Sequence, residues 1–140
     1  RRFLPDTSAP VNVEWGEENR TVGLRVPDAT PQNRRVENRL AGADANPYLA
    51  LAASLLCGYI GMVEQLPPSQ PVKGRGYERR NLRLPLTLEA ALERMETCRE
   101  LEKYLSPKFI TGYVAVKRAE QENYHRVISS WEREFLMLSV

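Results

Sequence analysis

The segment RRVENRLAGADANPYLA, residues 34–50, contains the change from strand-like to helix-like sequence that decides the fold. Arg35, Glu37 and Arg39 stand at every second position, so a β-strand would point all three side chains to one face. A turn rich in Gly, Ala, Asp and Asn follows, and the Asn-Pro pair before the next apolar run is typical of a helix start. The segment therefore predicts a strand followed directly by a helix.

The residues before this segment also have the character of strands. VNVEW at 11–15 alternates between apolar and polar side chains, and RTVGLRV at 20–26 is rich in β-favouring residues. The turn-forming stretch GEEN separates them, so we expect an antiparallel hairpin over 11–26. A third strand is expected over 34–40.

The residues after it are predicted to be helical. Helices are expected over 45–64, 87–104 and 107–136, with a loop rich in Pro and Gly over 66–86. The first helix is almost wholly apolar, but polar residues and glycines interrupt it, which favours a buried helix over a membrane span. The predicted fold class is α+β: part of a curved antiparallel sheet in the N-terminal third, followed by packed α-helices. The expected N-terminal caps are Asp44 or Asn46, Thr87 and Ser106.

Composition limits the classes of function. The chain has 140 residues, enough for one domain, and a net charge of only +2, which argues against nucleic acid as a partner. Among the 20 basic residues arginine greatly outnumbers lysine, and arginine is preferred where carboxylates or phosphates are held in fixed geometry. Cys57 and Cys98 show no metal-binding spacing and fit a reducing, cytoplasmic location without a membrane. Because the chain starts without Met, we expect it to be a fragment.

The charged face over 34–40 has two interpretations. Most exposed charge runs are solvated salt-bridge surfaces. Arg20 and Arg25 lie on the neighbouring predicted strand, however, and a carboxylate such as Glu37 suits Mg²⁺ while arginines suit phosphates. This second interpretation is an ATP–metal site built on a sheet. Arg20 is at an even position and Arg25 at an odd one, so a regular strand would point their side chains to opposite faces. A bulge near Gly23 would bring them to one face, and the sequence permits it.

Several motifs together resemble the glutamine synthetase family. NRTVGLRVP at 19–27 and RRVENRLAGADANPYLALAASLLCG at 34–58 resemble its C-terminal catalytic region, and EREFLMLSV resembles its C-terminus. The variant ENRLAGADANPYLALAASL is more similar to the γ-glutamylpolyamine (γ-glutamylputrescine) synthetase branch. The resemblance implies that residues 1–140 are the C-terminal part of a catalytic domain, with a β-grasp domain and further metal ligands upstream.

The resemblance implies an ATP-dependent ligase. ATP phosphorylates the γ-carboxylate of glutamate, and an amine then displaces phosphate from γ-glutamyl phosphate. The family works as hexameric rings, so a homo-oligomer, a dodecamer, is expected, and the isolated chain is expected to be inactive. The implied site consists of Arg20 (catalytic, and in contact with ATP and glutamate), Arg25 and Arg35 (ATP), Glu37 (a ligand of Mg²⁺ or Mn²⁺), and Arg39 and Arg2 (the substrate carboxylate).

Departures from the family pattern concern the acceptor. Ser8 stands where the ammonia-using members carry a glutamate that attracts and deprotonates ammonium, so the resemblance favours an alkylamine or polyamine acceptor. Gln32 replaces a common nucleotide-contacting lysine, and the shortened loop around Tyr77 gives no expectation of a modified tyrosine. The alternatives are an ammonia-using glutamine synthetase and a non-catalytic ring-forming homologue. His125 is interpreted as an ordinary surface or packing residue.

Overall fold

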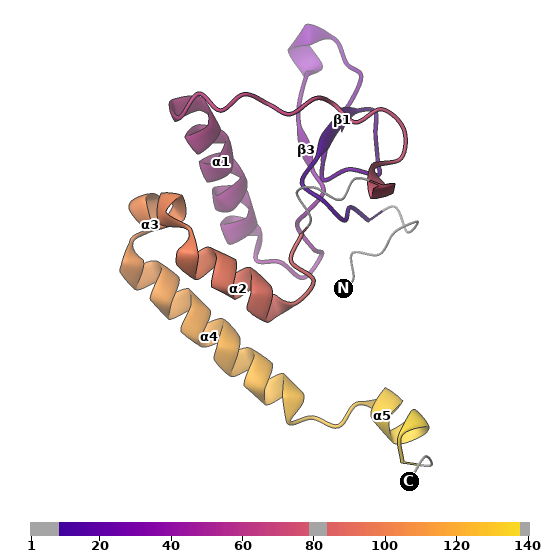
Figure 1. Ribbon diagram of the computed structural model, residues 1–140, viewed down its shortest axis with the longest axis vertical. Coiled ribbons are helices and arrows are strands. Elements are labelled where there is room, and N and C mark those ends of the chain that lie inside the picture. Colours follow the sequence, from indigo (N-terminus) through magenta and orange to yellow (C-terminus); the bar gives the residue numbers. More distant parts are fainter. Residues whose placement is uncertain (1–8, 79–83, 138–140) are drawn as a thin grey trace. The chain divides into compact units, whose positions relative to one another are not determined.

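The computed structural model describes residues 9–78 and 84–137, so the predicted roles of Arg2 and Ser8 fall outside the described residues. The chain forms two compact units, Arg1–Leu86 and Thr87–Val140. The first contains a small sheet and one long helix, and the second contains helices alone (Figure 1). This order of a sheet followed by helices confirms the predicted α+β class.

The sheet has three short strands in the order β1-β2-β3: β1 (Trp15–Glu17), β2 (Leu24–Val26) and β3 (Glu37–Asn38). β2 and β3 are antiparallel, as expected, and their register places Arg25 opposite Glu37. Facing residues of an antiparallel pair have their side chains within contact distance. The register of β2 on β3 therefore brings a guanidinium and a carboxylate together.

The predicted hairpin over 11–26 is wrong, because β1 and β2 run parallel. The connection between them is a loop rather than a tight reversal. Glu18 begins it with a positive φ of 48°, and the amide of Asn19 donates to the carbonyls of Val72 and Gly74 at 3.0 and 2.8 Å. These contacts hold the connecting loop in place, and the chain returns through it to start β2 parallel to β1. The sequence showed turn residues there, but the anchoring partners lie more than 50 positions away.

Gly23 lies in a bend before β2 and does not form the bulge between paired strands that the sequence permitted. It marks a close approach of two backbone segments: a Cβ at this position would collide with the carbonyl oxygen of Asn12 and lie 2.8 Å from a methyl group of Leu40. Arg20 is in the connecting loop rather than on a strand, so no bulge is needed to bring Arg20 and Arg25 to the same face of a strand.

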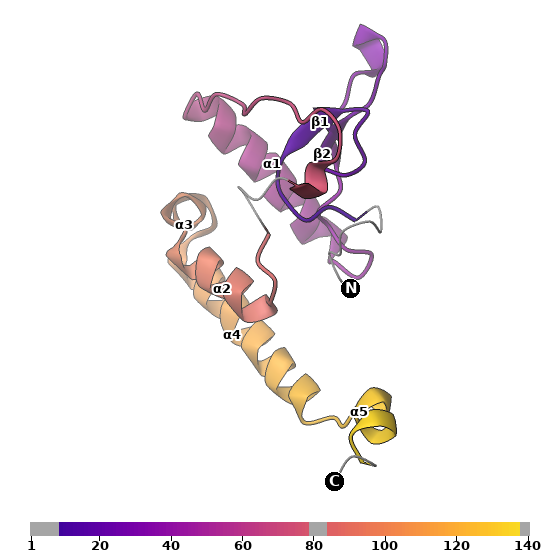
Figure 2. The same ribbon diagram turned by 45° about the vertical axis from the view of Figure 1, so that its right-hand side comes forward.

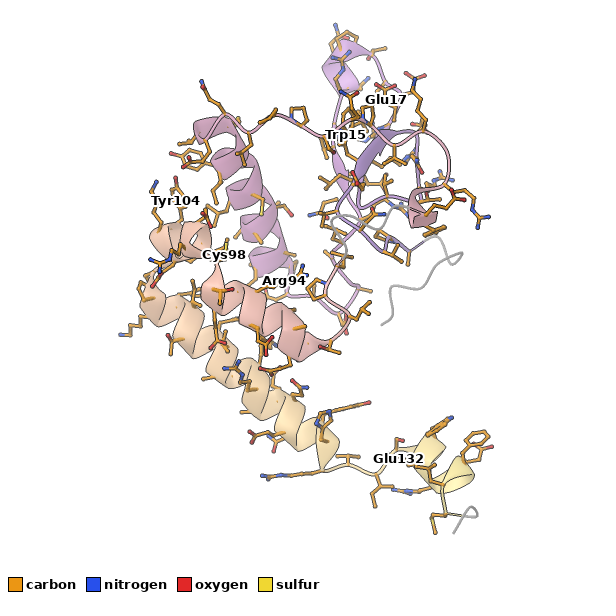
Figure 3. The ribbon with its side chains drawn as sticks, in the orientation of Figure 1. Trp15, Glu17, Arg94, Cys98, Tyr104 and Glu132 are labelled. Carbon is orange, nitrogen blue, oxygen red and sulfur yellow. The ribbon has the colours of Figure 1, made fainter. Side chains whose placement is uncertain are left out.

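The Pro/Gly-rich segment over 66–86 was expected to be a surface loop, but part of it is built into the first unit. Trp15, labelled in Figure 3, donates its indole N–H to the carbonyl of Ser69 at 2.7 Å. The backbone N–H of Val72 donates to the carbonyl of Trp15 at 2.8 Å, and Val72 is buried. Asn12 donates to the carbonyl of Gly76. Residues 69–76 are thus held along β1 and the loop that follows it.

Helix α1 (Pro47–Val63) forms as predicted, and Asn46 is its cap, since its side-chain oxygen accepts from the N–H groups of Tyr48 and Leu49. The expectation that this helix is buried is wrong for the described chain: none of its residues is buried, and Tyr48 is 83% exposed. Apolar side chains lie on every side of the helix, so no single contact covers them. No helix in the described part of the chain is long and apolar enough to cross a membrane.

The second unit consists of α2 (Leu88–Thr97), α3 (Arg99–Leu105), α4 (Pro107–His125) and α5 (Ser130–Phe135). α2 and α3 lie against α4 (Figures 1 and 2). The buried side chains of Leu92, Ile110 and Val114 form its core. The expected caps are confirmed, since Thr87 accepts from the N–H of Ala90 and Ser106 from that of Phe109.

The helix predicted over 87–104 is divided at Cys98, where ψ becomes 97°. The apolar pattern explains this break. In an unbroken helix Leu101, nine positions after Leu92, would lie about 180° round the axis from it. The break at Cys98 changes the direction in which the side chains after it point, so that Leu101 and Leu105 also pack against the core. The predicted 107–136 helix is likewise divided, because Ser129 starts α5 with a capping box closed by Glu132.

We predict that Leu92→Ala lowers the free energy of unfolding of the 140-residue chain by about 2–5 kcal/mol, since Leu92 is 2% exposed in the core of the second unit. Urea unfolding followed by circular dichroism measures the change. Leu86→Ala is the matched control, because Leu86 is 88% exposed and should change stability little. Equal effects of the two substitutions would contradict this packing.

Candidate active site

The centre of the site is the carboxylate of Glu37 on β3, which is held between two arginines. Arg25, directly across the sheet on β2, donates from Nη1 to Oε2 of Glu37 at 2.7 Å. Arg39 donates from Nη1 to the other oxygen, Oε1, at 2.9 Å. Both carboxylate oxygens thus accept a charge-assisted hydrogen bond, which is a strong class of interaction.

A second carboxylate extends this arrangement. Arg25 also donates from Nη2 to Oε2 of Glu18 at 2.7 Å. The other oxygen of Glu18 accepts the backbone N–H of Asp28 at 2.5 Å. The four side chains therefore alternate in charge in the order Glu18, Arg25, Glu37, Arg39, and we call them the ion-pair chain. The Arg25 side chain is only 13% exposed, so it is the most enclosed member.

The arginines lower the pKa values of both carboxyl groups. The pKa of Glu37 is below its ordinary value chiefly because of the hydrogen bond from Arg25, with a further contribution from Arg39, while burial opposes the shift. The pKa of Glu18 is lowered by Arg25 and then by the N–H of Asp28. Both groups are therefore ionised at neutral pH, which is the state in which a carboxylate binds a cation.

Not all the predicted site residues meet at this point. Arg35 donates to the backbone carbonyl of Asn33 at 3.3 Å and does not contact Glu37, so the alternation over 34–40 joins only Glu37 and Arg39. Arg20 lies in the β1–β2 loop, where it lines a hollow of about 400 Å³ beside residues 71–74. Its charge acts on Glu18 at longer range.

The metal ligand set implied by the family resemblance is present only in part. Glu37 accepts one hydrogen bond on each oxygen, and a carboxylate has about four lone-pair positions, so it retains acceptor capacity for a cation. Within the described residues no group of three His, Cys, Asp or Glu side chains is arranged to hold a metal ion. Glu37 fits as one ligand of a hard divalent cation, and further ligands must come from elsewhere.

Two residues of the site were missed by sequence reasoning. Glu18 and Asn19 were interpreted as turn formers within GEEN, with no role in the site. Glu18 belongs to the ion-pair chain, and Asn19 ties the loop carrying Arg20 to Val72 and Gly74. Neither has a periodic signal, because both act from a loop whose path depends on distant partners. The Asn-Arg pair at 19–20 was noted only as part of a longer motif.

Comparison with known proteins identifies the family. The model of the glutamine synthetase catalytic domain matches residues 1–136. The chain belongs to the glutamine synthetase family. It is 39% identical over 137 residues to gamma-glutamylputrescine synthetase PuuA of Escherichia coli, covering 98% of this chain and 29% of that protein. It is 32% identical to a glutamine synthetase of Methanocaldococcus jannaschii, covering 94% and 31% of the two chains.

A solved structure is similar in fold to this chain. The GmaS/ADP complex superposes with a TM-score of 0.77 at 33% identity, covering 91% of this chain and 30% of that one. The fold of the described chain is thus similar to that of this solved structure. The present chain spans about a third or less of the length of each relative it matches.

The ion-pair chain makes a prediction about Glu37 in the metal-free protein. Because its pKa is lowered from 4.5, its pairing stabilises the fold above that pH, and this stabilisation is lost as the pH falls through the lowered value. We predict that Arg25→Gln raises the Glu37 pKa more than Arg39→Gln does, measured by carboxyl ¹³C NMR titration. Arg35→Gln is the control and should leave this pKa unchanged, since Arg35 does not contact Glu37. An equal rise in all three variants would contradict the assignment.

Proposed function

We propose that this chain is the C-terminal catalytic part of an ATP-dependent ligase that joins the γ-carboxylate of glutamate to an amine. The observation that carries the proposal is the Glu37 carboxylate, ionised and held between Arg25 and Arg39, in a chain of the glutamine synthetase family. The relatives named above are ligases of this kind, and one related structure is described as holding ADP.

Each residue has a distinct role in this proposal. Arg25 and Arg35 bind the nucleotide phosphates, and Arg20 contacts the phosphoryl group in transit. Arg39, with Arg2, holds the α-carboxylate of glutamate. Guanidinium groups suit these roles because their donors match phosphate and carboxylate oxygens in fixed directions. Glu37 is one ligand of Mg²⁺ or Mn²⁺, an ion that neutralises charge on the phosphates.

The reaction has two steps, and the proposed residues act mainly on the first. A γ-carboxylate oxygen of glutamate attacks the γ-phosphorus of ATP, and ADP leaves, which gives γ-glutamyl phosphate. The amine nitrogen then attacks the acyl carbon, phosphate leaves, and the nitrogen loses a proton. Arg20 and Arg25 stabilise negative charge that builds on phosphoryl oxygens, and guanidiniums already held in place do so without reorganising in the transition state.

For the acceptor, we propose an alkylamine, most simply a diamine or polyamine. Similarity to a protein named gamma-glutamylputrescine synthetase supports it. Ser8 supports it too, since the family resemblance implies that ammonia-using members carry a glutamate at this position. An amine with an alkyl chain has binding energy of its own to offer, whereas ammonium depends on the missing carboxylate. The similarity to glutamine synthetases keeps ammonia as the alternative acceptor.

The proposal also includes assembly and location. We propose that the complete protein is a homo-oligomer built from rings, as the family resemblance implies, and that it works in the cytoplasm. Within the described residues both cysteines are free thiols, which is consistent with a reducing compartment.

We predict that Glu37→Gln in the complete protein weakens Mg²⁺ or Mn²⁺ binding at least about tenfold and abolishes turnover, because a neutral amide is a poor ligand for a hard cation. Isothermal titration with the metal and an ADP-release assay measure the two effects. Glu64→Gln is the matched control, since Glu64 is an exposed residue at the end of α1. Unchanged metal dependence in Glu37→Gln would overturn the metal role.

We predict that the complete protein uses putrescine with a kcat/KM at least about tenfold higher than ammonium, because each buried methylene contributes to discrimination. Release of ADP with glutamate and either acceptor at equal concentration measures the ratio. Ser8→Glu should lower the ratio by restoring the carboxylate, and the neighbouring Thr7→Glu serves as its control. A preference of the wild type for ammonium would make the protein an ordinary glutamine synthetase.

A further inference from the structure

Glu18 is held in place through both its backbone and its side chain. Its N–H donates to the carbonyl of Val26 at 3.0 Å. Its carboxylate accepts from Arg25 on one oxygen and from the N–H of Asp28 on the other. Its φ of 48° lies in the left-handed region, which is unfavourable for a residue with a side chain. A backbone outlier that persists within such contacts is a starting point for a hypothesis about function.

The partner of Glu18 is the most enclosed arginine of the ion-pair chain. Arg25 donates from Nη2 to Glu18 and from Nη1 to Glu37, both at 2.7 Å. Each terminal nitrogen of its guanidinium is therefore paired with a different carboxylate. Two of the five N–H donors of the group are used in this way, and each terminal nitrogen keeps one further N–H, whereas Nε is buried. With Glu37 alone, the guanidinium would keep one anchor and could rotate about it.

We propose that Glu18 is a positioning residue, whose carboxylate fixes the orientation of the Arg25 guanidinium so that its remaining N–H donors meet a nucleotide phosphate. This inference rests on the proposed function, in which Arg25 binds the phosphates of ATP. Glu18 itself touches no substrate. It acts through Arg25, and it remains as an anchor when Glu37 is engaged by a cation.

Two electrostatic effects of Glu18 oppose each other. As an anion, it repels a polyphosphate. It is already paired with Arg25 at 2.7 Å, however, and its side chain is 51% exposed, so water and the guanidinium screen its charge. The orientation of Arg25 is a short-range effect that solvent does not screen. We therefore expect removal of Glu18 to weaken nucleotide binding rather than to strengthen it.

The test is a double-mutant cycle in the complete protein. The variants are Glu18→Gly, Arg25→Ala and the pair together, and the measurement is the dissociation constant of ADP by isothermal titration. Glycine tolerates the positive φ at position 18, so this variant removes the carboxylate without adding backbone strain. Glu64→Ala is the control, because the Glu64 side chain is exposed and lies outside the ion-pair chain.

We expect Glu18→Gly to weaken ADP binding about tenfold in the wild-type background and not at all in the Arg25→Ala background, since the residue acts only through Arg25. Equal weakening in both backgrounds, or tighter binding in Glu18→Gly, would overturn the proposal. A fall in melting temperature that accompanies an equal loss in both backgrounds would assign Glu18 a purely structural role.

A second measurement is independent of nucleotide. The rate at which phenylglyoxal modifies Arg25, followed by peptide mass spectrometry, should rise several-fold in Glu18→Gly and stay unchanged in Glu64→Ala. An unchanged rate in Glu18→Gly would overturn the positioning role. Failure of the wild-type protein to bind ADP would instead overturn the proposed function, and the rate of modification would still decide whether Glu18 orients Arg25.

Discussion

The pairing of Arg25 with Glu37 across β2 and β3 is the interaction on which the site depends. An antiparallel pair is specified by its register, because a slip of one residue moves every side chain to the other face. In the observed register the guanidinium and the carboxylate face each other, and Arg39, directly after the end of β3, reaches the same carboxylate. A slip would separate these charges, so the ion pairs favour the register that assembles the site.

The second constraint is the anchoring of the segment 69–76 along β1. Through its single amide, Asn19 bonds two carbonyls of that segment and the backbone and hydroxyl of Thr21. Asn19 is half-buried, and these four hydrogen bonds satisfy the amide nitrogen and oxygen that water reaches only in part. The same contacts direct the β1–β2 loop and place Glu18 beside Arg25. Thus a single side-chain amide links the packing of a distant loop to the geometry of the charged site.

Helix α1 shows how much of the apolar surface this chain leaves uncovered. It has apolar side chains on all sides, and none of its residues is buried in the described structure. A helix of this kind is typical of the interior of a large domain. The second unit contrasts with it, because α2, α3 and α4 bury a core of their own around Leu92, Ile110 and Val114. The helical unit therefore satisfies its apolar pattern locally, whereas α1 does not.

The sequence by itself determined the α+β class, the start of α1 at a cap of either Asp44 or Asn46, the caps at Thr87 and Ser106, and the family, because these depend on local spacing and short motifs; the structure selects Asn46. It also predicted that Glu37 and Arg39 lie close together, although β3 ends at Asn38 and Arg39 follows it. Only the tertiary structure decided that β1 and β2 run parallel, that the helices break at Cys98 and before Ser129, and that Glu18 belongs to the site while Arg35 contacts Asn33 instead. The physical reason is that each of these features depends on partners that are distant in sequence or on how apolar faces meet in space. A periodic pattern in one segment contains no information about either.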